Sequence, residues 1–87
     1  MKLEHLFPEL TERQADILKA VAQGFTNEYI GNMEGISERT VEYHVGNLID
    51  ILIEKNAHIT YPEFNSRVRL SHLFHSRVGE AFFEVLR

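Results

Sequence analysis

Cysteine is absent from this chain of 87 residues, and cationic side chains are scarce. Without cysteine there can be no disulfide, thiolate metal site or cysteine nucleophile, and the composition fits a cytoplasmic protein. Lys and Arg number 9 against 13 Asp and Glu, which gives a formal net charge of −4. Because phosphate contacts supply much of the affinity for nucleic acid, this balance disfavours DNA binding unless the cations gather locally.

A long apolar run is also missing. Residues 1–5 contain one lysine with no apolar stretch after it, so we expect neither a signal peptide nor a membrane span. The sequence shows no nucleophile with a neighbouring base, no glycine-rich phosphate loop and no paired carboxylates, so we expect no enzyme and no catalytic residue. His72 and His75 lie three positions apart without an acidic partner at matching spacing, so we expect no metal and no cofactor.

Three segments in the first 56 residues begin with the same helix-start pattern. Thr11, Thr26 and Ser37 can each cap a helix with a side-chain oxygen, and a glutamate stands near each helix start. Gln14 completes a capping box with Thr11. The chain therefore carries local signals for three helix starts.

Glycines follow the first two of these segments. Gly24 and Gly35 stand where a helix end takes the left-handed conformation, which predicts helices over 12–22, 27–33 and 38–54. The positions expected to face the core are Ile17, Leu18, Val21 and Ala22, then Tyr29, Ile30 and Met33, then Val41, Val45, Leu48 and Leu52. A short helix, a turn containing glycine and a longer helix are typical of a helix-turn-helix unit.

The rest of the chain predicts a loop over 57–62 and a C-terminal helix over 63–87. We therefore expect one all-α domain over 1–87, with a helix-turn-helix three-helix core in 1–56 followed by a long C-terminal helix. One short domain cannot easily cover all the large apolar residues of this last helix. The predicted dimer or partner interface consists of Leu70, Phe74, Phe82, Phe83 and Leu86.

The segment from Leu10 to Leu52 resembles the LuxR/GerE family of DNA-binding domains. The matching positions are Leu10-Thr11, Leu18, Ala22, Gly24, Thr26-Asn27, Ile30, Gly35-Ile36-Ser37, Thr40-Val41, His44, Leu48 and Leu52. The resemblance implies a LuxR C-terminal-like four-helix domain from a bacterial or phage regulator, usually dimeric through the fourth helix. It also implies that the third helix enters the major groove. Family members commonly carry Lys or Arg where this chain has Glu42, and often a basic residue where it has Ile51.

The helical spacing of residues 38–54 gives the candidate DNA-reading surface. With the apolar positions turned inward, Arg39, Tyr43 and Asn47 lie one turn apart on the outer face, beside Gly46. Arginine can pair with guanine and asparagine with adenine. The full predicted DNA-binding set is Thr26, Asn27, Ser37, Arg39, Thr40, Tyr43, His44 and Asn47, in which Thr26, Asn27, Ser37, Thr40 and His44 are candidates for phosphate contacts.

The leading hypothesis is a homodimeric transcriptional regulator that reads double-stranded DNA with its third helix. The alternative is an acidic helix-turn-helix module that binds another regulator and modulates it, because Glu38, Glu42, Asp50 and Glu54 accompany a single arginine on that helix. A structural domain within a larger complex is a third possibility, in which the outer face is an ordinary solvated surface. His44 also fits a packing role at the edge of the core.

Overall fold

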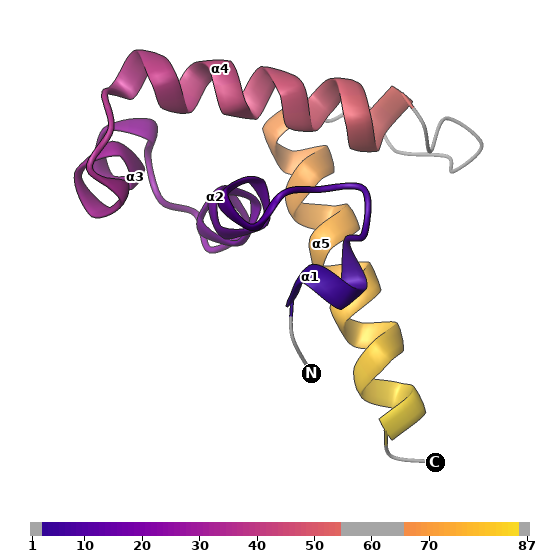
Figure 1. Ribbon diagram of the computed structural model, residues 1–87. Helices are drawn as coiled ribbons and strands as arrows, with labels where there is room; N and C mark the ends of the chain where they lie inside the picture. The colour runs from indigo at the N-terminus through magenta and orange to yellow at the C-terminus, as the bar shows by residue number, and fades with distance from the viewer. Residues whose placement is uncertain (1–2, 55–65, 86–87) are drawn as a thin grey trace.

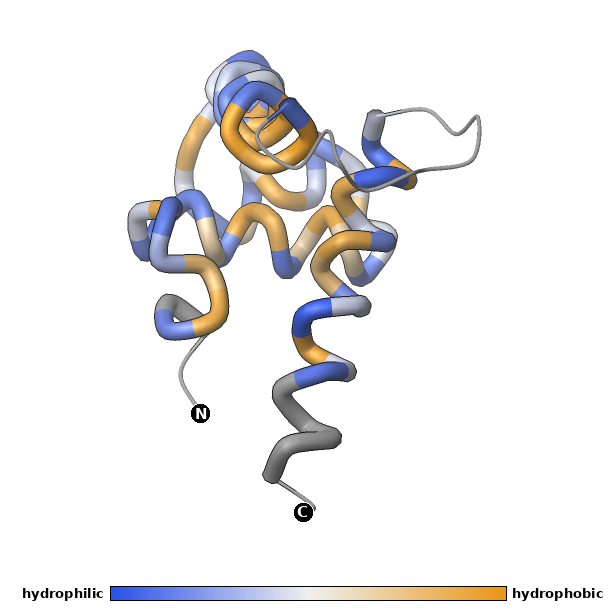
Figure 2. Tube along the Cα trace, turned by 90° about the vertical axis from the view of Figure 1, so that its right-hand side faces the viewer, coloured by the Kyte–Doolittle hydropathy of each residue, from blue (hydrophilic) through white to orange (hydrophobic). Residues whose placement is uncertain are grey.

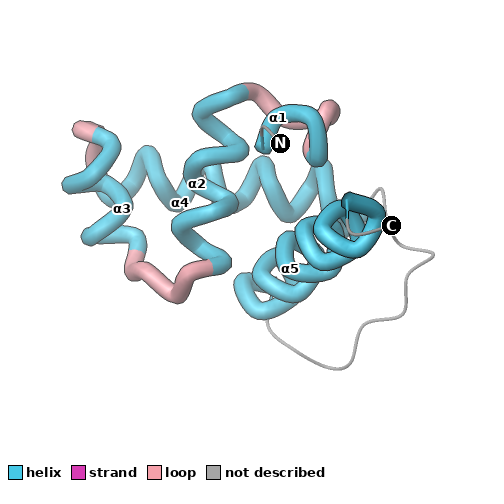
Figure 3. Tube along the Cα trace, turned by 90° about the horizontal axis from the view of Figure 1, so that it is seen from below, coloured by secondary structure: helices cyan, strands magenta, loops and turns pink. Residues whose placement is uncertain are grey.

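The computed structural model describes residues 3–54 and 66–85, with side chains for 5–54 and 66–80. Every element in these residues is helical, and Figures 1 and 3 show helices joined by loops, with no strand in the described part. The elements are α1 (Leu3–Leu6), α2 (Glu12–Ala22), α3 (Asn27–Glu34), α4 (Glu38–Leu48), the π-helix η1 (Ile49–Glu54) and α5 (Ser66–Val85). The predicted all-α class, a helix-turn-helix core with a long C-terminal helix, is confirmed. The predicted loop over 57–62 lies outside the described residues.

The predicted helix starts are present as hydrogen bonds. The Thr11 hydroxyl accepts from the amide of Gln14 at 3.2 Å, and the Gln14 side chain accepts from the amide of Thr11 at 2.9 Å. Thr26 caps α3 by accepting from the amide of Tyr29 at 3.2 Å, and Ser37 caps α4 in the same way at 3.1 Å. Local sequence therefore determines where α2, α3 and α4 begin.

The turn between α3 and α4 depends on two glycines. Gly35 has φ 69°, in the left-handed region that favours glycine, and its amide donates to the carbonyl of Gly31. A Cβ on Gly31 would lie 2.7 Å from the carbonyl oxygen of Ile36, which is closer than real Cβ contacts come. Glycine at position 31 is therefore needed for the chain at Ile36, just before α4 begins, to pass this close to α3.

The core lies between α2, α4 and α5, and Ile17, Leu18 and Leu48 are fully buried in it. Figure 2 shows apolar positions in short stretches along each helix, and no described helix is both long and apolar enough to cross a bilayer. The expectation for α3 was partly wrong. Ile30 is buried, but Tyr29 and Met33 are 50% and 49% exposed, because the short α3 packs on α2 and α4 through one side only.

α5 packs across α2 and buries the first half of its apolar stripe. Leu70 is 0% exposed and Phe74 is 8% exposed, and the Phe74 ring stacks on Phe7 with centroids 5.7 Å apart. These two residues fill the core of the single chain, so their assignment to a dimer or partner surface is corrected. The side chains of Phe82, Phe83 and Leu86 lie outside the described residues, so that part of the interface stays a prediction.

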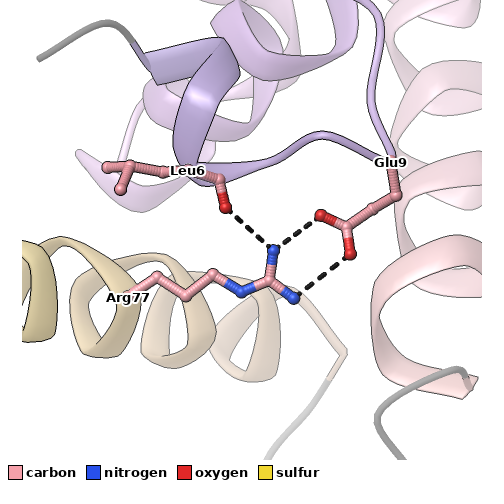
Figure 4. A network of polar contacts seen from close by, with 3 residues as sticks. All are labelled: Leu6, Glu9 and Arg77. Atoms are coloured by element: carbon pink, nitrogen blue, oxygen red, sulfur yellow. Dashed lines mark hydrogen bonds and ion pairs between the residues drawn. The ribbon is translucent and has the colours of Figure 1, made fainter.

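Arg77 of α5 holds the N-terminal segment in place, as Figure 4 shows. Its guanidinium donates to both carboxylate oxygens of Glu9, at 2.6 and 3.3 Å, and to the carbonyl oxygen of Leu6 at 3.1 Å. The same group lies 4.8 Å from the centroid of the Phe7 ring. The N-terminal segment with α1, which was not predicted, is therefore fastened to α5 by a charged hydrogen bond and a cation–π contact.

The helix predicted over 38–54 has the expected extent, but its last part differs in winding. After Leu48 the chain continues as the π-helix η1, where Leu52 is fully buried. Ile49, Ile51 and Ile53 are half-buried and pack against the core. A π-helix has more residues per turn than an α-helix, and here it accompanies a nearly continuous apolar run that borders α5.

Candidate nucleic-acid interface

α4 lies along one side of the molecule, with α2, α3 and α5 all on its other side, as Figure 1 shows. Val41, Val45 and Leu48 turn toward these helices and are buried. The opposite face of α4 is not covered by any other described element. A helix held on one face and free on the other can enter a groove of suitable width.

Four exposed residues form a stripe on the free face of α4. Arg39, Glu42, Tyr43 and Gly46 are all exposed, and their spacings of three and four positions put them on adjacent turns. Tyr43 is 68% exposed, the largest fraction among the exposed large apolar residues of the described chain. We call these four residues the α4 stripe.

The α4 stripe differs by one member from the predicted reading row. Arg39 and Tyr43 are exposed as expected, whereas Asn47 is only half-buried at the edge of the face. Glu42, which was not included in the predicted DNA-binding set, is exposed. The exposed centre of the face is therefore shifted toward Glu42 and away from Asn47.

Gly46 packs against none of the residues that the structure describes. A Cβ built on this residue meets nothing within 4 Å. Glycine inside a helix costs about 0.5–1 kcal/mol relative to alanine, because it loses more backbone freedom on folding. The α4 stripe thus contains a destabilising residue that leaves the helix backbone open next to Tyr43, where an outside group can approach closely.

Thr40 and His44 lie on the flank of α4 and are half-buried. The Thr40 hydroxyl is 2.8 Å from the Ser37 hydroxyl, so both belong to the cap of the helix. The His44 ring meets Tyr43 edge-on with centroids 6.0 Å apart, and its Nδ1 atom is buried without a hydrogen-bond partner in the described residues. His44 therefore lies beside Tyr43 on the flank of α4.

The start of α3 carries a cation that sequence reasoning did not include in the site. Arg67 of α5 donates to the side-chain oxygen of Asn27 at 2.6 Å and also donates to the carbonyl oxygen of Phe25. Arg67 and Asn27 are 40 positions apart, so no local pattern could have paired them. This places a guanidinium beside the free amides at the start of α3, where a helix favours anions.

Some of the other described cations form ion pairs within the chain, and others are exposed without such a pair. Arg13 pairs with Glu34 at 3.7 Å, and Arg77 pairs with Glu9 at 2.6 Å. Arg39, by contrast, makes no hydrogen bond or ion pair with any described residue. Exposed carboxylates are Glu38 and Glu42 on α4 and Asp50 and Glu54 on η1. The positive charge available to a phosphate backbone near α4 is therefore small and local.

One histidine of the α5 pair, His75, contacts the end of α2. His75 Nε2 hydrogen-bonds the carbonyl oxygen of Ala22 at 3.2 Å, and the Ser71 hydroxyl donates to the same oxygen at 3.4 Å. These contacts satisfy a carbonyl at the end of α2. Among residues 5–54 and 66–80, no group of three or more candidate ligand side chains is placed to hold a metal ion.

Comparison with known proteins gives matches in the N-terminal part of the chain. Residues 8–56, more than half of the chain, match the family model described as "Bacterial regulatory proteins, luxR family". The nitrate/nitrite response regulator protein NarP of Escherichia coli is 46% identical over 46 residues, which is 53% of this chain and 21% of NarP. The probable transcriptional regulatory protein SgaR of Hyphomicrobium methylovorum is 49% identical over 43 residues, 49% of this chain and 20% of SgaR.

The response regulator protein VraR of Staphylococcus aureus is 37% identical over 51 residues, which is 59% of this chain and 24% of VraR. This chain thus spans about a fifth to a quarter of the length of these relatives. No solved structure matches the chain at a significant level. The matched residues contain α2, α3 and α4, and hence the α4 stripe.

Proposed function

This chain belongs to the luxR family of bacterial regulatory proteins, and from that premise we propose that it is a DNA-binding transcriptional regulator that inserts α4 into the major groove. The observation that carries the proposal is the free face of α4, where Arg39, Tyr43 and Gly46 are exposed. In helix-turn-helix proteins the N-terminal half of the second helix meets the base edges. Arg39, Glu42 and Tyr43 of the α4 stripe lie in that half.

Contacts with the phosphate backbone would come from the two helix starts beside the α4 stripe. The amides at the starts of α3 and α4 are oriented donors, and they act whatever the net charge of the chain is. Arg67 adds a guanidinium next to Asn27. The proposed contact set is therefore Thr26, Asn27, Ser37, Thr40 and His44 for phosphates, and Arg39, Tyr43 and Asn47 for bases.

A homodimer is part of the proposal, because helix-turn-helix proteins commonly read two half-sites with two subunits. The last turns of α5 extend beyond the other helices, as Figure 1 shows, and the sequence puts Phe82 and Phe83 there. We expect sedimentation equilibrium to give twice the monomer mass at micromolar concentration. A Phe82→Ser, Phe83→Ser double variant is expected to be monomeric and still helical.

Selection of bound sites from random duplexes, followed by salt titration, tests DNA binding directly. We expect the selected duplex to bind with an affinity that falls as salt rises. Arg39→Ala should weaken specific binding by about 1–3 kcal/mol without unfolding the chain. If Arg39 meets a phosphate instead of a base, the variant will reduce the slope of log K against log salt by about 0.9.

Lys19→Ala is the matched control, because Lys19 is an exposed cation on α2, away from the free face of α4. It should leave the ranking of selected sites unchanged. Selection that enriches no duplex at low salt, with folded protein, would contradict the proposed function. Equal binding by the wild type and Arg39→Ala would contradict the assignment of the reading face.

The exposed carboxylates of α4 and η1 favour a second candidate function. Glu38 and Glu42 of α4 and Asp50 and Glu54 of η1 give these two consecutive elements an acidic surface, which fits a module that binds a basic face of another regulator. Such a protein would show no duplex affinity at moderate salt but would co-purify with a partner. The same titration therefore separates the two candidates.

A further inference from the structure

Arg39 and Glu42 stand side by side on the α4 stripe with opposite charges and complementary hydrogen-bonding capacity. Resting on the proposed function, we infer that these two residues together read a G·C-rich step, with Arg39 donating to guanine and Glu42 accepting from the amino group of cytosine. In this inference Glu42 determines specificity and is not merely an unfavourable charge. It thus deepens the proposed function by naming bases for one step of the operator.

Both side chains are free to take an outside partner. Each is exposed, and neither forms a hydrogen bond or ion pair with any residue that the structure describes. Glu38 differs, because it is the first residue of α4, where the helix dipole favours a carboxylate. Glu42 lies a turn further on, beyond the reach of that effect, beside Tyr43 and Gly46.

The spacing suits two neighbouring base pairs. Residues three positions apart in a helix lie on the same side, and a rise of about 1.5 Å per residue separates them by about 4.5 Å along the axis. Successive bases on one strand are about 3.4 Å apart. With α4 in one position in the groove, Arg39 and Glu42 can therefore contact adjacent base pairs. The absence of a side chain at Gly46 lets the helix come close enough to the bases for these contacts.

Hydrogen-bond chemistry selects the bases. Guanine offers two acceptors in the major groove, which suit the donors of an arginine, and cytosine offers the N4 amino donor, which suits a carboxylate. Thymine offers an acceptor and a methyl group, so a carboxylate has no partner there. Adenine has an amino donor next to the N7 acceptor, so the second carboxylate oxygen would face a lone pair.

The negative charge of Glu42 also works against wrong sites. Moving a carboxylate out of water costs free energy unless a hydrogen-bond donor replaces the water. Duplexes without cytosine at this position should therefore bind more weakly. The same charge weakens attraction to phosphates in general. The expected result is modest overall affinity with strong discrimination at one base pair.

The experiment is selection from random duplexes with the wild type, Glu42→Gln and Glu42→Ala, followed by binding measurements at every base of the selected position. We expect the wild type to prefer cytosine by about tenfold or more over the other bases. Glu42→Ala should lose that preference at one base pair only. Glu42→Gln should move the preference toward adenine, because a carboxamide pairs with the donor and acceptor of adenine.

Glu54→Gln is the matched control, because it makes the same change of charge at an exposed residue at the end of η1, well beyond the α4 stripe. It should change no base preference. If Glu42→Gln and Glu42→Ala raise affinity for all duplexes equally and keep the wild-type preference, the carboxylate only repels phosphates and the inference is overturned. If neither the wild type nor any variant enriches a duplex, the proposed function fails instead, so the two failures are distinguishable.

Discussion

Replacing Gly46 by alanine should move folding stability and DNA affinity in opposite directions. The new methyl group meets no atom within 4 Å among residues 3–54 and 66–85, so no steric cost from this part of the chain opposes the gain in helix propensity. That gain is about 0.5–1 kcal/mol. A kilocalorie per mole raises the Tm of a domain of this size by about 4–8 °C, so we expect thermal unfolding about 2–8 °C higher than in the wild type.

On DNA the same methyl group would be inserted into a close contact between the α4 backbone and the groove. Inserting a methyl group into a packed contact costs about 1–3 kcal/mol, which corresponds to an affinity about 5- to 150-fold lower for the selected duplex. Circular dichroism melting and fluorescence anisotropy with a labelled duplex measure the two effects on one sample. A gain in Tm with a loss of affinity cannot come from a folding defect.

Gly79→Ala controls for the change in helix propensity. Gly79 also lies within a helix, and a Cβ at this position would meet none of the described atoms within 4 Å. It should raise the Tm without changing duplex affinity. The reasoning about the α4 stripe would be refuted if Gly46→Ala raised the Tm and left affinity unchanged, and if Gly46→Leu also bound as the wild type does. In that case the helix backbone does not approach the bases.

Three further predictions concern the framework that holds α4. Gly31→Ala should destabilise the chain by about 1–3 kcal/mol in urea unfolding, because the new Cβ would lie 2.7 Å from a backbone oxygen. Arg77→Met should cost about 1–2 kcal/mol by the same assay, because it removes the bonds to Glu9 and Leu6 but keeps the apolar stem; an unchanged midpoint would show that the pair contributes nothing. Ser37→Ala should lower stability by about 1 kcal/mol through loss of the α4 cap, and Ser37→Asp should restore it in thermal melts.

Local signals fixed most of the secondary structure in advance. The caps at Thr11, Thr26 and Ser37 were predictable because each bond joins groups three positions apart. The left-handed glycines were predictable because few other residues tolerate that conformation. The short α1 was missed because four residues carry too little periodicity to predict a helix.

The arrangement of the candidate site could be predicted only in part. Helical periodicity was enough to put Arg39 and Tyr43 on the outer face of α4. Periodicity could not tell that Glu42 would be exposed and Asn47 half-buried, because the exposure of residues at the edges of a helix face depends on tertiary packing. Arg67 was missed because its partner Asn27 is remote in sequence.

The sequence by itself determined where the helices begin, which residues cap them and which side of α4 is apolar, because these depend on groups within about a turn of one another. Tertiary structure alone decided that Leu70 and Phe74 fill the core instead of a partner surface, since that requires α5 to fold back over α2. It also decided the pairing of Arg77 with Glu9, 68 positions away. Such contacts form only when distant segments meet, and no local spacing of residues encodes which segments those are.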